Sequence, residues 1–332
     1  MKGFVKMKNR KKILKRVCII TIIAICGTIG FFGNELVNQK GQDTDEIYEV
    51  LEVNHIAVAA YDYDIESVEL TKKVKKEFKD KVPVYKVKAK KYSDKDIKRV
   101  VKNTINCSIE NIETDKDTNY YELENGGYVT YYKNSGTISY KIIENDNEQS
   151  STAQISNDVL VEKANEFLKT SELYDIKDLH MYKVGPSVTM RTSDSMEEEI
   201  LEYEVMYVKK APEGIDGFDG TGPGIIVNYN AKGELIGFVS INKEIELTDM
   251  MYPAKETNDI EKDIIENNNV MIYSTADVGE NIELKEVENV LYCDSIGEKQ
   301  EYMIPHYRLC DKDNNELEVV IPAIDNKYLK IK

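Results

Sequence analysis

The sequence predicts an α+β protein in which an N-terminal transmembrane helix is followed by repeated modules of a helix packed on an antiparallel β-sheet. Three observations lead to this class. Segments in which apolar and polar residues alternate recur along the chain, separated by turns that contain Asn and Gly. Segments with an apolar face of helical period precede groups of such strands three times. An uncharged apolar run follows a basic N-terminus.

The N-terminus predicts a membrane anchor. Residues 1–16 contain eight Lys or Arg residues and no acidic residue, and residues 17–34 are uncharged. An apolar run of this length is near the lower limit for a spanning helix, and the basic flank keeps the N-terminus in the cytoplasm. We therefore expect a cytoplasmic tail at 1–16, a signal anchor at 17–36 and a single-pass cell-membrane protein whose bulk is extracellular.

A cleaved signal peptide is the alternative to this anchor. Phe31 and Phe32 stand where a cleavage site needs small residues. Ile23 and Ile25 precede Cys26, where a lipoprotein signal also needs small residues. We favour the retained anchor, although the flanking residues alone leave cleavage open.

The composition restricts the kind of partner. All 60 acidic residues follow residue 34, together with 36 of the 44 basic residues, so the exterior part has a net charge of −24. This charge argues against binding to nucleic acid or to anionic lipid, because both attract positive charge. About 295 residues remain outside the membrane, which is enough for two or three modest domains.

Between the anchor and the first readable strand, residues 37–81 are expected to form a juxtamembrane linker region. The segment begins with polar residues, continues with a stretch whose period fits either strand or helix, and ends with a charged, weakly helical stretch.

The first α+β module is expected at 82–145. Residues 82–90 alternate as a strand does, and Ser93 is a suitable N-cap for the helix that follows. Asn-Gly-Gly at 125–127 and Ser-Gly at 135–136 predict the turns of an antiparallel meander.

A second and a third module are expected at 155–248 and 253–332. In the second, Ser156 is the expected N-cap of a helix, and several strands follow, with a hairpin turn at 230–233. In the third, a helix with an isoleucine stripe precedes three strands.

The glycine-rich stretch at 214–224 invites comparison with a phosphate-binding loop. Such a loop needs a Lys-Ser or Lys-Thr pair that leads into a helix, whereas a strand pattern follows here. We therefore expect a flexible loop between two long strands, which still offers a contact site.

Two Asp-rich stretches, 115–119 and 311–315, imitate the start of a calcium loop. Both lack Gly at position 6 and Glu at position 12, so Asx-type turns are the better interpretation. His55, His180 and His306 have no Cys or carboxylate nearby at metal-ligand spacing.

No catalytic set of residues is recognised. There is no GxSxG motif, and Glu197, Glu198 and Glu199 fit a solvated face. Cys293 and Cys310 lie on adjacent predicted strands, where a disulfide and two buried thiols both remain open; we favour the thiols. We expect no catalytic, cofactor or metal site, and no enzyme. The tyrosines around 120–132 are expected to form cross-strand pairs.

Parts of the sequence resemble a family of regulatory proteins. VPVYKVKAKKYSDKDIKRVV resembles the opening of extracytoplasmic proteins of the YycH/YycI type, which are single-pass accessory proteins of low-GC Gram-positive bacteria. SNDVLVEKANEFL and YEVMYVKKAPEGIDGFDGTGPGIIVNYNAKGELIGF are similar to a helix-plus-sheet module of the PepSY and YycI kind. EYMIPHYRL and LEVVIPAI resemble its closing strands, so the resemblance covers roughly 82–325.

This resemblance implies control of a membrane sensor kinase and carries over no catalytic residue. We therefore expect a membrane-anchored extracytoplasmic regulatory or binding protein that modulates a membrane partner, such as a two-component sensor histidine kinase. The alternative is a PepSY-like envelope protein that binds or inhibits a secreted protease, and a cell-wall hydrolase ranks below both. The identity of the partner and the oligomeric state stay open.

Overall fold

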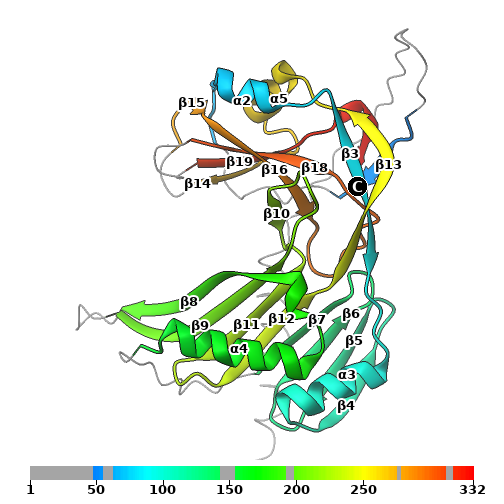
Figure 1. Ribbon diagram of the computed structural model, residues 1–332, viewed down its shortest axis with the longest axis vertical. Coiled ribbons are helices and arrows are strands. Elements are labelled where there is room, and N and C mark those ends of the chain that lie inside the picture. The colour runs from blue at the N-terminus through cyan, green and yellow to red at the C-terminus, as the bar shows by residue number, and fades with distance from the viewer. Residues whose placement is uncertain (1–47, 55–62, 143–153, 192–197, 275–277, 312–316) are drawn as a thin grey trace, which may run out of the picture.

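The computed structural model describes residues 48–54, 63–142, 154–191, 198–274, 278–311 and 317–332. Figure 1 shows two sheet-and-helix bodies at opposite ends of the molecule, joined by two long strands, β3 and β13. The predicted α+β class is confirmed. The predicted tail at 1–16 and signal anchor at 17–36 lie outside the described residues, and no described helix is long and apolar enough to cross a membrane.

One body is an eight-stranded sheet in which all neighbouring strands are antiparallel. In spatial order its strands are β4 (Ile109–Thr114), β5 (Thr118–Leu123), β6 (Tyr128–Tyr132), β7 (Thr137–Lys141), β12 (Leu235–Ile241), β11 (Gly224–Asn230), β9 (Glu198–Lys209) and β8 (Leu179–Arg191). The predicted turns at 125–127, 135–136 and 230–233 join β5 to β6, β6 to β7 and β11 to β12.

Two helices cover one face of this sheet (Figure 1): α3 (Asp94–Val100), continued by the π-helical turn η1 (Val101–Ile105), and α4 (Asn157–Ser171), after which comes the 3₁₀ turn η2 (Ile176–Asp178). Their apolar faces share one core with the tyrosines and aliphatic residues of the sheet. Ser93 is the N-cap of α3, as predicted, and it forms a capping box, because the Asp96 N–H donates to Ser93 Oγ and the Ser93 N–H donates to the Asp96 carboxylate. Ser156 is the N-cap of α4 by its backbone angles, but its side chain makes no capping bond.

The other body is a five-stranded sheet with α2 (Lys72–Glu77) and α5 (Thr257–Ile265) packed on its apolar core. In spatial order its strands are β10 (Gly217–Gly220), β16 (Glu286–Cys293), β18 (Pro305–Cys310), β19 (Leu317–Pro322) and β14 (Met271–Ser274).

Three smaller pairings complete the structure. β3 (Lys81–Ala89) lies between β13 (Lys243–Pro253) and β17 (Tyr302–Met303), and the other two are the parallel pairs β2 (Ser67–Leu70) with β15 (Asn281–Leu284) and β1 (Leu51–Val53) with β20 (Leu329–Ile331). The 3₁₀ turn η3 (Asn326–Tyr328) precedes β20. β1 pairs with the C-terminal strand β20, and Leu51 of β1 packs in the core of the body that contains the five-stranded sheet. The segment that follows the predicted anchor region is therefore attached to this body.

Most strands of the first two predicted modules belong to one sheet, because β7 pairs directly with β12, whereas β3 and β10 lie in the other sheets. The register runs from Thr137 opposite Ile241 to Lys141 opposite Gly237. The helices of both modules accordingly share one apolar core. The division into modules at 82–145, 155–248 and 253–332 stays a prediction.

Candidate functional site

Part of the glycine-rich stretch at 214–224 forms a short strand, β10 (Gly217–Gly220), which corrects the prediction of a loop throughout. Residues of β10 pair in parallel with β16, from Gly217 opposite Val290 to Gly220 opposite Cys293. The stretch therefore connects the eight-stranded sheet to the edge of the five-stranded sheet (Figure 1). Gly220 has a φ of +69°, and a Cβ atom there would lie 2.3 Å from the Cys293 carbonyl oxygen. Only glycine fits this close approach.

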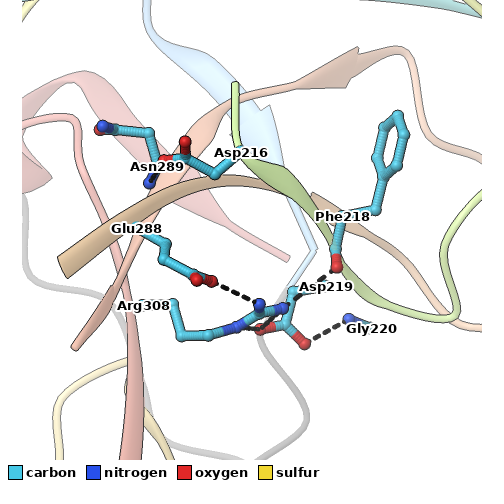
Figure 2. A network of polar contacts seen from close by, with 7 residues as sticks. All are labelled: Asp216, Phe218, Asp219, Gly220, Glu288, Asn289 and Arg308. Carbon is cyan, nitrogen blue, oxygen red and sulfur yellow. Dashed lines mark hydrogen bonds and ion pairs between the residues drawn. The ribbon is translucent and has the colours of Figure 1, made fainter. Parts of the chain in front are cut away.

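Arg308 holds β10 in place (Figure 2). Its guanidinium donates to the Asp219 carboxylate at 3.2 Å, to the Glu288 carboxylate at 2.9 Å and to the Phe218 carbonyl oxygen at 3.1 Å. The Asp219 side chain is only 10 % exposed, so its interaction with Arg308 is largely shielded from water. A second carboxylate, Asp216, accepts the Asn289 N–H at 2.7 Å.

Replacing Arg308 with methionine is expected to lower the free energy of unfolding by about 1.5–3 kcal/mol, because charge-assisted hydrogen bonds to the largely buried Asp219 carboxylate are lost. Hydrogen exchange of the amides of β10 should become faster in the same variant. Arg99→Met is the matched control, since Arg99 pairs with Asp96 and Glu172 on the surface, and it should cost less than about 1 kcal/mol. Equal effects of the two substitutions would contradict the anchoring role of Arg308.

A polar pocket of about 240 Å³ lies beside β1. We call it the β1 pocket. One wall comes from residues 49–54 and the other from the segments around β16, β17 and β18. Its lining comprises buried side chains and an exposed charged rim: Glu49, Val50, Leu51, Glu52, Val53, Asn54, Asn269, Tyr292, Asp294, Lys299, Gln300, Glu301, Tyr302, Ile304, His306, Pro322 and Lys332.

Asp294 is a buried acid in this pocket, with 6 % of its surface exposed. Burial raises the pKa of its carboxyl to about 6, and the cation of Lys243 and the hydrogen bond from Asn54 oppose this rise. The Asn54 amide donates to Oδ2 of Asp294 at 2.5 Å. Among the described residues, the Oδ1 atom accepts no hydrogen bond. Asn54 thus links the segment after the predicted anchor to this carboxylate.

His306 is a second buried titratable group that lines the pocket. Its Nδ1 atom lies 3.0 Å from the Ile304 carbonyl oxygen and must carry the proton, because a carbonyl oxygen only accepts. Burial lowers the pKa of the imidazole to about 4, so the ring is neutral at pH 7. Its Nε2 atom then offers a lone pair, and no described residue donates to it.

Gln300 connects the pocket to a buried lysine. Its Oε1 atom accepts from Lys243 Nζ at 3.0 Å and from the Asp294 N–H at 3.3 Å, while its Nε2 atom donates to the Tyr292 carbonyl oxygen at 2.9 Å. Lys243 Nζ also lies 3.2 Å from Cys293 Sγ. Thr221, which follows β10, donates to the Asp294 carbonyl oxygen at 2.6 Å. The glycine-rich stretch and the pocket are therefore parts of one polar network.

Cys293 and Cys310 are free thiols, as favoured from the sequence, but only Cys293 is buried, whereas Cys310 is partly exposed. In the β16–β18 register, Cys310 lies opposite Glu286, at the end of β16 remote from Cys293. This separation excludes a disulfide between the two strands, because the Cα atoms of a disulfide lie within about 7 Å of each other.

The connection at 115–117 is closed by the Asp115 N–H, which donates to the Thr118 carbonyl oxygen at 2.8 Å. The Asp115 carboxylate accepts the N–H of the next residue, Lys116, at 2.6 Å, so the expected Asx turn, which uses the N–H two residues on, is not formed by Asp115. No group of three or more potential metal ligands occurs among the described residues.

Tyr120 and Tyr128 stack across neighbouring strands with ring centroids 5.3 Å apart, as predicted for the tyrosine-rich meander. His180 is exposed on β8. His55, Glu197 and the second Asp-rich turn, around 312–315, lie outside the described residues.

Sequence reasoning assigned no role to Asp294, Asn54 or Gln300. The one local signal is that Asp294 directly follows the apolar strand β16, where a charged residue marks either a turn or a buried acid. The partner of Asp294 is 240 residues away in sequence, so spacing carries no information about the contact.

Comparison with known proteins identifies no family. No family model matches the chain, and no curated protein matches it. Among solved structures, it is similar to an uncharacterized protein from Eubacterium rectale ATCC 33656, with 10 % sequence identity and a TM-score of 0.36 over 74 % of this chain and 84 % of that one.

Proposed function

We propose that the protein is a membrane-anchored extracytoplasmic regulatory protein that modulates a membrane partner, such as a sensor histidine kinase. The observation that supports this function is the composition of the β1 pocket. One wall is residues 49–54, which follow the predicted anchor at 17–36 after a short linker, and the other wall belongs to the five-stranded and three-stranded sheets.

This arrangement links the pocket to the chain nearest the membrane. Asn54 bonds to the buried Asp294, and β1 pairs with β20, so a change at the pocket shifts the segment that leads to the anchor. In this proposal a signal from outside is passed to another membrane protein.

Photocrosslinking in cells tests the function. A photoreactive residue is placed at Val50 in the full-length protein, or at Tyr182 on the remote edge strand β8, both of which are exposed. We expect Val50 to capture a membrane sensor protein that Tyr182 does not capture. Replacing residues 17–36 by an unrelated span should change the output of that partner. Identical captures at the two positions, or an unchanged output, would refute the proposal.

A further inference from the structure

Two largely buried side chains that can accept hydrogen bonds line the β1 pocket. Asp294 and His306 are 6 % and 4 % exposed, and both line the cavity. The described residues donate to neither the Asp294 Oδ1 atom nor the His306 Nε2 atom. Neither atom is among the buried side-chain atoms that lack a partner, so both are reachable from the cavity, where water or a ligand can donate to them.

The charges around the cavity favour a cationic donor. The cations on the rim are already paired: Lys299 with Glu301, and Lys332 with Glu52 at 3.1 Å. Asp294 remains without an ion pair among the described residues. The exterior part of the chain is strongly acidic as a whole, which raises the local concentration of cations.

The remaining lining limits the size and shape of the ligand. Leu51, Ile304 and Pro322 supply apolar surface, and Tyr292 adds an aromatic ring beside His306, with ring centroids 5.2 Å apart. A cavity of about 240 Å³ is smaller than the ~300–1,000 Å³ that drug-sized ligands occupy. The site therefore suits a small molecule with one polar end.

We propose that the β1 pocket binds the primary ammonium group of a small amine, which donates its N–H groups to Asp294 and His306. The short apolar part of the amine lies against Leu51, Ile304 and Pro322. The ligand would act on the segment 49–54, so this inference deepens the proposed regulatory function, and its biological meaning rests on that function. The binding itself is measurable without a partner.

Binding should depend on pH through the Asp294 carboxylate. The groups that bear on its charge are Lys243 on β13, Asn54 after β1, Glu298 in the β16–β17 connection and Lys332 after β20. With a carboxyl pKa of about 6, Asp294 is ionised at pH 7.5 and largely neutral at pH 5, so a cation should bind more weakly at the lower pH.

Calorimetric titration of the full-length protein in detergent micelles tests the assignment with four probes: butylammonium, butan-1-ol, tetramethylammonium and the dipeptide amide Ala-Ala-NH₂. At pH 7.5 we expect butylammonium to bind at least tenfold more tightly than butan-1-ol, which has no charge, and tetramethylammonium, which has no N–H. The affinity for butylammonium should fall at least fivefold at pH 5. Tighter binding of the dipeptide would assign the site to peptide N-termini, and tighter binding of butylammonium to free amines.

Two variants distinguish binding in the β1 pocket from nonspecific attraction of cations to the acidic chain. Asp294→Asn should weaken binding of butylammonium at least tenfold, whereas Asp249→Asn removes the same charge from an exposed position on β13 and should change the affinity less than twofold. Equal affinities for butylammonium and tetramethylammonium, an unchanged affinity in Asp294→Asn, or no binding of any amine would each overturn the assignment. None of these results would alter the crosslinking at Val50, so the two proposals fail separately.

Discussion

Replacing Asp263 with alanine is expected to lower the free energy of unfolding by about 3–5 kcal/mol, the largest effect of any single substitution considered for this chain. Asp263 on α5 and Lys255 before it are almost completely buried, with side chains 6 % and 1 % exposed, and they form an ion pair at 2.5 Å. Removing the acid leaves a buried ammonium group without its counterion.

The cost is high because Asp263 has further partners. The amide groups of Asn268 and Asn326 each donate to its carboxylate at 2.9 Å. These bonds join α5 to the turn that follows it and to the 3₁₀ turn η3 before β20. Burial lowers the pKa of Lys255, while the hydrogen bond to Asp263 raises it, so losing Asp263 removes the main interaction that keeps this lysine charged.

Urea unfolding measures the effect. It is followed by circular dichroism because the chain has 22 tyrosines but no tryptophan whose fluorescence could report unfolding. Glu261→Ala on the same helix is the matched control. Glu261 pairs with Lys75 at 3.0 Å on the surface, and its loss should cost less than about 1 kcal/mol. The double variant Lys255→Met/Asp263→Leu should be more stable than Asp263→Ala, because no unpaired charge is buried. If Asp263→Ala is no more harmful than Glu261→Ala, the buried pair does not stabilise the fold.

Local signals in the sequence predicted the elements that depend on local interactions. The alternation over β3 and the Ser93 cap of α3 are set by residues within three or four positions of each other. The turn at 125–127 likewise contains its own determinant, a glycine at φ +78°. These features needed no knowledge of the rest of the chain.

The features that were missed depend on distant residues. β10 depends on its pairing with β16 and on the contact between Arg308 and Asp219, which are 89 positions apart in sequence. Strands of the two predicted modules share one sheet because β7 pairs with β12, although α4 and four strands intervene along the chain. In the pocket, Asp294 looks like any acid after a strand until Asn54 and Gln300 are placed beside it. Such long-range pairings are set by tertiary packing, which hydrophobic period and turn residues do not encode.

The two buried titratable groups of the β1 pocket should give opposite pH dependences of stability. The pKa of Asp294 is raised from 3.8 to about 6, so the folded state binds more protons than the unfolded state between these values, and stability falls as the pH rises through this window. The pKa of His306 is lowered from 6.5 to about 4, so the unfolded state binds more protons, and stability falls as the pH drops from 6.5 to 4.

In the wild-type protein the two pH dependences largely cancel. Replacing one of the two groups should therefore reveal the pH dependence that the other group causes. At pH 7, Asp294→Asn should raise the free energy of unfolding by up to about 3 kcal/mol, because each pKa unit corresponds to about 1.4 kcal/mol and a buried charge is removed. Between pH 7 and pH 5 the free energy of unfolding of Asp294→Asn should fall by about 2 kcal/mol through the protonation of His306 in the unfolded state. The reference is a double variant in which His306 is replaced as well.

His306→Gln keeps a donor for the Ile304 carbonyl oxygen and removes the titration, so this variant should gain about 1 kcal/mol between pH 7 and pH 5. Urea titrations of both variants and of the wild-type protein at pH 5, 6 and 7 give the comparison, and the other carboxylates contribute equally to all three curves. If the free energy of unfolding depends on pH in the same way in all three proteins, the pocket does not shift the pKa of either group. Divergent curves would show that the fold maintains a charged acid and a neutral imidazole at a cost in stability, as expected where a protein reserves both groups for a ligand.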